Sequence, residues 1–348
     1  IGVSLTIIFL ILKNKLIMLF GASLVTFPYA NTYLTIYTLG TFFALMAVGL
    51  NFFIACQGFP MVSMFTVIIG AITNIALDTV FIFKLGMGVS GAAWATVIAQ
   101  TLSFAFAFKF LTGNKTRVKI VFRGHSFRII KNIVKFGFSP FFITTTDSVI
   151  LIALNAMLQK YGGAGKGDLL ISGAAIIQSY ILLITGPLLG LSGGTQPLLS
   201  FNYGAKKIER VKQAEKYIVI FALVMTSTMF VLTRFISPYF ISFFTNEKEL
   251  SCIAYEGIKA SLWGIIPLSF QYCFVDGFTS VGRIKTAFGL SMFRKCTYVL
   301  SVCVLPVFFG AESAFFAQSV GDYIGATMCV IIFSLIFNKH LERRVKQN

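Results

Sequence analysis

The stretch Ile68–Gln100, IIGAITNIALDTVFIFKLGMGVSGAAWATVIAQ, has two features that decide the fold. It belongs to two apolar runs, residues 61–84 and 88–112, that are each long enough to cross a bilayer as a helix, and a glycine-rich corner joins them. It also places a carboxyl group, Asp78, inside the first run, four residues after Asn74. A charge at the bilayer centre costs at least about 2.5–3.5 kcal/mol, so this aspartate needs a structural or functional reason.

The whole chain shares this apolar character. Of its 348 residues, 57% are hydrophobic and 12% are charged, whereas a soluble domain carries about 25% charged residues. The apolar runs are continuous rather than alternating, which favours helices over a membrane β-barrel. Because helices satisfy their own backbone hydrogen bonds in lipid, the composition predicts an all-α polytopic membrane protein.

Ten apolar segments are expected to be helical, and all except the first are long enough to span the membrane. The first resembles the last half of a helix. The segments are predicted at residues 1–12, 29–56, 61–84, 88–112, 136–160, 167–190, 214–245, 250–281, 284–309 and 313–338.

The formal net charge of +17 is concentrated in every second connection between these segments. Basic connections of membrane proteins face the cytoplasm, so these connections and the C-terminus are predicted to be cytoplasmic. This distribution argues against nucleic-acid binding. The six cysteines form no CxxC pair and are expected to be small apolar side chains.

An internal repeat links the two ends of the chain. GVSGAAWATVIA at Gly88–Ala99 aligns weakly with GAESAFFAQSVG at Gly310–Gly321, and the order of helices and loops matches as well. Parallel repeats are a known transporter architecture, with the substrate site between the halves. The second half has six segments and the first has three and a fragment, so we expect twelve helices in the intact protein, with about two and a half upstream of Ile1.

The predicted domain organisation follows from the repeat and the charges. We expect the remainder of an N-terminal lobe (helices 3–6) at residues 1–112 and a C-terminal lobe (helices 7–12) at residues 136–338. A basic cytoplasmic linker is expected at residues 113–135, and a basic cytoplasmic tail at residues 339–348.

Asp78, Asn74 and Thr96 form the first candidate site. Counted at about 1.5 Å per residue from the glycine corner, Asp78 and Thr96 both lie roughly 12 Å deep, on adjacent antiparallel helices. Asn74 shares a helix face with Asp78. An amide and a hydroxyl can hydrogen-bond a carboxyl in either protonation state, which suits proton exchange or sodium binding. The alternative is a structural polar cluster that ties the helices together.

Asp147 is the second candidate. It follows three threonines near mid-membrane and is expected either to attract cationic ligands into a cavity or to form a polar patch in helix packing. Gln196 lies between Gly193–Gly194 and Pro197, which are expected to loosen or end the helix there. Gln178 and Gln271 are candidates to line a cavity, with core or lipid-facing positions as the alternative for each.

Asp276 and Asp322 are weaker candidates. Asp276 lies near the predicted cytoplasmic end of its helix, within reach of interfacial water. Asp322 lies among small residues that permit close helix packing.

Two of these stretches resemble a known family. NIALD at Asn74–Asp78, with the FIFKLGMGVSGAAWAT that follows, resembles the fifth and sixth helices of multidrug and toxic compound extrusion (MATE) transporters. TQPLLSFNYGAKKIERVKQA at Thr195–Ala214 resembles the segment after their eighth helix. With the helix order, the resemblance covers essentially the whole chain and is closest to the bacterial multidrug-efflux branch. It implies a two-lobe bundle in a V, with about ten of twelve helices present.

The resemblance also implies a function. Such a protein would export bulky, often cationic, drugs in exchange for protons or sodium. It would be a monomeric integral protein of the bacterial cytoplasmic membrane. It would have no enzymatic activity and no cofactor. Asn74, Asp78 and Thr96 match positions used for cation coupling, with sodium at Asp78 as one option and no resident metal. Asp147 matches a carboxylate that some members carry on the seventh helix.

This chain departs from the family in two places. The acid that the family usually carries on its first helix is not in the chain. The loop ACQGFPM, Ala55–Met61, lacks the two basic residues usual after the fourth helix.

Three other functions remain open. A flippase for lipid-linked substrates would need a basic cavity, whereas the predicted intramembrane charges are mostly acidic, with Arg294 near a helix start as the main exception. A membrane-embedded enzyme would need clustered carboxylates for magnesium, whereas the four intramembrane aspartates are isolated from one another in sequence. A non-functional truncated transporter is the third alternative.

Overall fold

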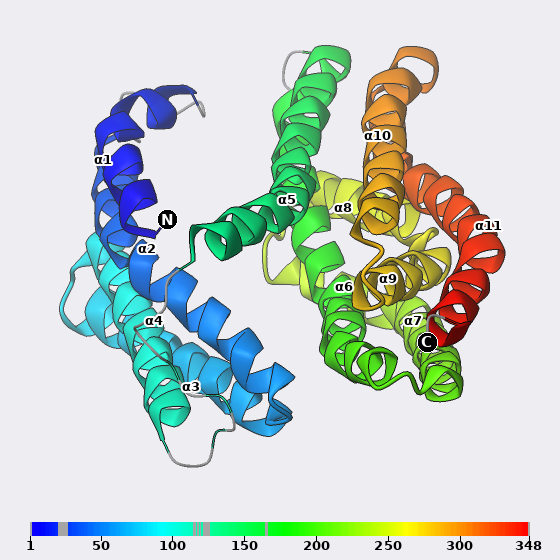
Figure 1. Cartoon of the computed structure of the whole chain (residues 1–348). Helices are drawn as coiled ribbons and strands as arrows, with labels where there is room; N and C mark the ends of the chain where they lie inside the picture. Colours follow the sequence, from blue (N-terminus) through cyan, green and yellow to red (C-terminus); the bar gives the residue numbers. More distant parts are fainter. Residues whose placement is uncertain are drawn as a thin grey trace. The chain divides into compact units, whose positions relative to one another are not determined.

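The computed structural model describes residues 2–19, 27–113, 116, 118, 120, 126–163 and 166–346. In these ranges the chain is helical, with no strand, and it divides into two compact units (Figure 1). We call residues 1–125 the N-terminal unit and residues 126–348 the C-terminal unit. Eight helices of the described part are long and apolar enough to cross a membrane, or nine with one bent pair counted as a single span. The predicted all-α membrane fold is confirmed.

The N-terminal unit contains four α-helices and one π-helical turn. They are α1 (Gly2–Leu19), α2 (Phe27–Cys56), α3 (Pro60–Asp78), the π-turn η1 (Thr79–Lys84) and α4 (Gly88–Thr112). α4 packs against both α2 and α3. The corner before α4 requires glycine, because Gly86 and Gly88 have φ angles of +63° and +53°.

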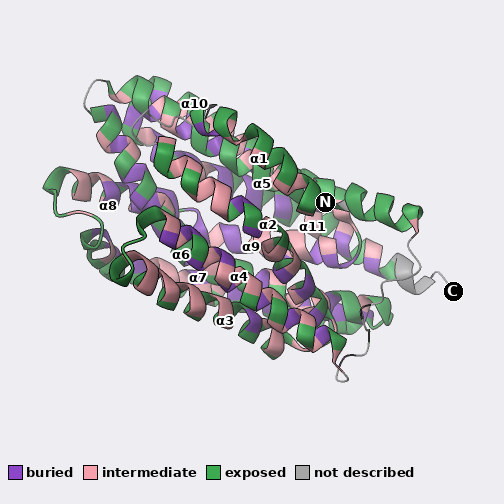
Figure 2. Ribbon diagram, turned by 90° about the vertical axis from the view of Figure 1, so that its left-hand side faces the viewer, coloured by how far each residue is buried: buried purple, intermediate pink, exposed green. Residues whose placement is uncertain are grey.

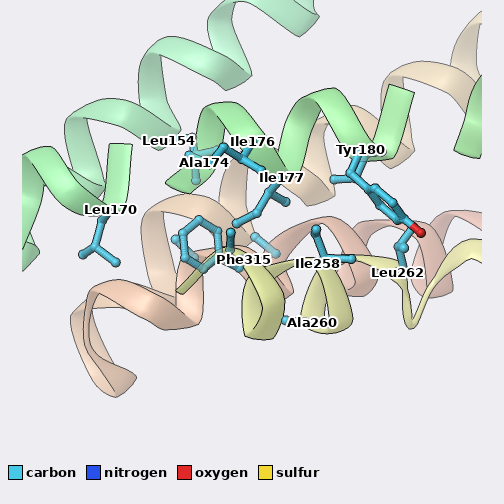
Figure 3. Close-up of a cluster of buried hydrophobic side chains, with 14 of the residues drawn as sticks. Leu154, Leu170, Ala174, Ile176, Ile177, Tyr180, Ile258, Ala260, Leu262 and Phe315 are labelled. Carbon is cyan, nitrogen blue, oxygen red and sulfur yellow. The ribbon is translucent and has the colours of Figure 1, made fainter. Parts of the chain in front are cut away.

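The C-terminal unit is the larger one. Its helices are α5 (Phe127–Gly162), α6 (Lys166–Gly204), α7 (Ile208–Ser242), α8 (Lys248–Leu262), α9 (Ile265–Ser280), α10 (Ile284–Phe309), the 3₁₀ turn η2 (Ala311–Phe316) and α11 (Ala317–Lys346). Figure 3 shows one part of its core, where Ile177 and Tyr180 of α6 meet Ile258 of α8 and Phe315 of η2.

The outer surfaces of both units are apolar. Exposed residues run along many of the helices (Figure 2), and large hydrophobic side chains such as Phe235 and Phe309 are among them. In water such a surface would drive association. In a bilayer it faces lipid, which agrees with the length and hydropathy of the helices.

Several helix boundaries differ from those expected from sequence, and those of α1 and α5 are among them. α1 continues beyond residue 12 to Leu19, because the Lys13 ammonium donates a hydrogen bond to Thr35 Oγ1 of α2 at 2.7 Å. α5 begins at Phe127, inside the segment expected to be a linker. Residues 114–115, 117, 119 and 121–125 of that linker, and residues 347–348 of the tail, lie outside the described residues.

α6 does not end near residue 190, as its glycines and proline suggested, but runs unbroken to Gly204. Pro197 removes a backbone donor, and its ring crowds the carbonyl of residue 193. Since lipid provides no alternative hydrogen-bond partners, the remaining backbone stays helical around the proline.

The single helix expected at residues 250–281 is instead a pair, α8 and α9, bent by 49°. Ser319 of α11 stabilises the bend. Its hydroxyl accepts a hydrogen bond from the Gly264 N–H at 3.1 Å and donates one to the Ala260 carbonyl at 2.6 Å. These bonds satisfy backbone groups that the bend frees inside the protein.

Close packing of α2 on α4 gives a stability prediction. A side chain at Gly40 would place its Cβ 2.6 Å from Val97 Cγ2, so Gly40→Val should destabilise the N-terminal unit by about 1–3 kcal/mol through overpacking. Thermal unfolding in detergent measures this. Gly49→Val is the matched control, because nothing lies within 4 Å of Gly49 on the same helix. Equal unfolding temperatures for the two variants would contradict the packing account.

Candidate functional site

The structure brings Asn74 and Thr96 together in the N-terminal unit. The Asn74 amide donates a hydrogen bond to Thr96 Oγ1 at 3.4 Å, which joins α3 to α4. Both side chains line a cavity of about 320 Å³ between α2, α3 and α4. Asn51 and Gln100 line it as well, and an amide oxygen of each is buried without a hydrogen-bond partner among the described residues. The cavity therefore contains polar atoms with unused capacity for hydrogen bonding.

Asp78 lies one turn beyond Asn74, at the last position of α3, where the π-turn η1 begins. It does not line this cavity. Its Oδ1 is buried and finds no hydrogen-bond partner in the described part of the chain. The structure thus joins two of the three predicted residues directly and leaves the third with an unsatisfied oxygen. Single π-turns in helices are frequent at functional sites.

The C-terminal unit contains a smaller, charged cavity of about 130 Å³. Three charged side chains line it: Asp147 of α5, and Arg294 and Lys295 of α10. The rest of its wall is polar and apolar, contributed by Ile150, Gln178, Ile181, Thr185, Leu268, Tyr272, Tyr298 and Gln318. We call this the charged cavity.

Two ion pairs organise the charged cavity. Arg294 Nη1 lies 2.7 Å from Asp322 Oδ1 of α11. Lys295 pairs with Asp147 and also donates to the Ile143 carbonyl of α5 at 2.6 Å. Consecutive residues of a helix point about 100° apart. The Arg294–Lys295 dipeptide therefore connects α10 to α11 on one side and to α5 on the other.

The two pairs differ in burial. Asp322 is 1% exposed and its partner Arg294 is largely buried, so this pair lies inside the protein. In the other pair, the side chain of Lys295 is 5% exposed but that of Asp147 is 62% exposed. Asp147 therefore remains accessible from outside the unit, although it already has a counter-ion.

Aromatic and small residues shape the space around Arg294. Its guanidinium lies 5.8 Å from the centre of the Tyr272 ring, within the range of a cation–π interaction. Gly325 on α11 makes room for the stem of Arg294, since an added Cβ there would lie 2.6 Å from Arg294 Cγ. The small residues around Asp322 thus allow α10 to approach α11.

The other predicted residues lie at different places. Gln178 lines the charged cavity and hydrogen-bonds Tyr298. Gln271 is buried and donates to the Leu290 carbonyl of α10 at 3.3 Å, so it faces the helix packing rather than the cavity. Gln196 hydrogen-bonds Asp276 away from this cavity, where Ser192 also donates to that carboxyl.

Sequence reasoning missed several residues here. Arg294 was expected near a helix start, but it is the eleventh residue of α10, about 15 Å from its beginning. The site residues predicted from sequence do not include Lys295, Tyr272 or Tyr298. The sequence feature that indicates these residues is the Arg294–Lys295 pair inside an apolar run, because ionisable residues within a membrane span usually belong to a functional site.

Within the described ranges, no three His, Cys, Asp or Glu side chains gather as a metal site.

A polytopic helical protein with polar and charged cavities inside the membrane region has the features of a transporter. The comparisons with known proteins agree. The family model described as MatE matches residues 146–307. The multidrug export protein MepA of Staphylococcus saprophyticus is 23% identical over 337 residues, which cover 96% of this chain and 73% of that protein. MepA of Staphylococcus haemolyticus is also 23% identical over 337 residues, which cover 96% of this chain and 73% of that protein.

Solved structures show the same fold. An outward-facing multidrug resistance MATE transporter of the MOP superfamily has a TM-score of 0.88 at 21% identity, covering 99% of this chain and 77% of that one. A MOP superfamily transporter from Pyrococcus furiosus, described as having a binding pocket of reverse polarity, has a TM-score of 0.89 at 21% identity, covering 97% and 76%. Residues 146–307 thus match the MatE family model, and the described part of the chain has the fold of MATE transporters.

The buried ion pair gives a second stability prediction. Asp322→Asn leaves Arg294 as an uncompensated buried charge and should destabilise the C-terminal unit by about 3–5 kcal/mol. The double variant Arg294→Met/Asp322→Leu removes both charges and should recover much of that loss.

Chemical or thermal unfolding of the purified protein measures both effects. Glu209→Gln is the control, because it breaks an exposed pair with Lys212 worth about 0–1 kcal/mol. A loss for Asp322→Asn no larger than for the control would show that the pair is not buried as described.

Proposed function

We propose that this chain functions in secondary antiport and exports bulky, often cationic, drugs in exchange for protons or sodium. The observation that carries the proposal is the Asp147–Lys295 pair, an accessible carboxylate at a charged cavity, held by a lysine of the protein itself. The MepA relatives, named as multidrug export proteins, support the substrate class. We place the intact protein in the bacterial cytoplasmic membrane, as a monomer with its C-terminus and basic connections in the cytoplasm.

Lys295 acts in this proposal as an internal counter-ion. A carboxylate without a partner is costly in the membrane region, so Asp147 needs a positive charge while no drug is bound. An organic cation that enters the cavity competes with the Lys295 ammonium for the same carboxylate. The Tyr272 and Tyr298 rings line the cavity and offer apolar and cation–π contacts to a bulky cation. The lysine restores neutrality when the drug leaves.

Coupling to protons or sodium is assigned to the N-terminal unit. Asp78 has a buried oxygen without a hydrogen-bond partner among the described residues, so one proton or one sodium ion satisfies it. Asn74 and Thr96 hold α3 against α4 beside it. Binding or release at Asp78 would change the packing of these helices, as coupled transport requires.

A second candidate function is movement of an anionic, lipid-linked substrate. Two observations favour it: the charged cavity contains Arg294 and Lys295, and a structural relative is described by a pocket of reverse polarity. Each basic side chain is paired with a carboxylate, however, so the cavity has no excess of positive charge. Competition between organic cations and organic anions for binding distinguishes the two functions.

Substitutions at the Asp147–Lys295 pair test the drug site. Lys295→Met removes the competing ammonium and should tighten binding of a fluorescent monocation about 3–10-fold, since a factor of ten is 1.4 kcal/mol. Asp147→Asn should weaken binding by a similar factor. Fluorescence titration of the purified protein measures both. Tighter binding of an organic anion to Asp147→Asn, with no effect on the cation, would favour the second candidate.

Substitution of Asp78 tests the coupling role. In the intact protein, Asp78→Asn should abolish efflux of a fluorescent cationic dye from vesicles driven by a proton or sodium gradient, while dye binding persists. Asp168→Asn, at the first turn of α6, is the control for removing an acid outside the proposed sites. Transport at the wild-type rate in Asp78→Asn would show that Asp78 has no coupling role.

A further inference from the structure

A second buried acid lies in the C-terminal unit, outside the charged cavity. Glu215 is the eighth residue of α7, about 10 Å from the helix start, and is 4% exposed. Both of its carboxyl oxygens are buried, and neither has a hydrogen-bond partner within the described ranges. Burying a carboxyl group without a partner is costly. The buried and unpartnered carboxyl of Glu215 therefore points to a ligand.

Glu215 packs against a glycine beside another acid. A Cβ added to Gly277 of α9 would lie 2.7 Å from Glu215 Oε1, so the carboxyl occupies the space that any larger residue would fill. Asp276 is the next residue on α9. Its carboxyl accepts hydrogen bonds from Ser192 and Gln196 of α6. α6, α7 and α9 thus bring one unpartnered and one hydrogen-bonded carboxyl into neighbouring positions.

Two thiols and an apolar cluster also lie in this part of the C-terminal unit. Asp276 on α9 interacts electrostatically with Glu215, and Glu215 in turn interacts with the thiols of Cys273 on α9 and Cys329 on α11. α6 brings the uncharged Ser192 and Gln196 to Asp276, and α8 packs against the opposite end of α7. Both cysteines belong to a buried apolar cluster with side chains such as Phe278 and Leu199.

This environment discriminates between possible ligands. Hard metal cations are bound by shells of several oxygens, whereas thiols and apolar side chains suit them poorly. A proton needs a single oxygen. We propose that Glu215 is a proton-binding site of the C-terminal unit, which exchanges its proton through the partly exposed Asp276. The site is separate from Asp78, and the proposal does not rest on the transport function.

Infrared spectroscopy of the purified protein in lipid nanodiscs tests this directly. At neutral pH an exposed glutamate is ionised, so a protonated carboxyl band reports a buried acid. We expect such a band in the wild-type protein, its loss in Glu215→Gln, and its retention in the control Glu209→Gln, which lies on the same helix at the surface. An unchanged band in Glu215→Gln would overturn the proposal.

A second variant covers the case in which Glu215→Gln does not fold. Gly277→Ala meets only the flexible end of the Glu215 side chain, so it should fold while it displaces the carboxyl and shifts the band. An unshifted band would overturn the proposed geometry. Replacing choline chloride by sodium chloride should leave the wild-type band unchanged. Loss of the band in sodium would identify a metal-cation site and overturn the assignment to a proton.

Discussion

The pairing of Arg294 with Asp322 is the interaction on which the C-terminal unit depends. An isolated charge inside a protein in a bilayer is severely penalised, and only a close, hydrogen-bonded partner offsets that penalty. The 2.7 Å contact between α10 and α11 provides this partner. Because Lys295 follows directly and pairs with Asp147, one dipeptide fixes α10 to helices on both of its sides. The position of the charged cavity follows from these two contacts.

The two ion pairs have different consequences because their burial differs. Arg294 and Asp322 are enclosed, so exchanging either partner would expose an unpaired charge and disrupt the fold. Asp147 is accessible, so an incoming cation can replace Lys295 without leaving the carboxylate alone. The first pair is therefore structural, and the second is suited to ligand exchange. This contrast underlies the proposed function of the C-terminal unit.

Most of the fold was predictable from sequence because bilayer thickness sets the length of an apolar helix. Depth counted from the glycine corner matched Thr96 with Asp78, whereas the structure pairs Thr96 with Asn74, one turn away on the same helix. The failures involve tertiary contacts. Pro197 was expected to end a helix that lipid keeps intact, and the bend at Gly264 depends on a hydroxyl 55 residues later. Lys295 is separated from Asp147 by 148 residues, and no local pattern links them.

Glu215 shows a related limit. It lies at the second position of the helix expected at residues 214–245, next to a basic stretch, whereas α7 already begins at Ile208 and the Glu215 side chain is buried. Charge patterns locate the ends of spans to within one or two turns. One or two turns decide whether an acid is exposed or buried.

An experimental structure with a bound monovalent organic cation tests the central claim most directly. The account predicts that the cationic nitrogen contacts the Asp147 carboxylate and that the Lys295 ammonium has moved away, while Arg294 and Asp322 remain paired. A bound cation elsewhere, with the Asp147–Lys295 pair intact, would contradict it.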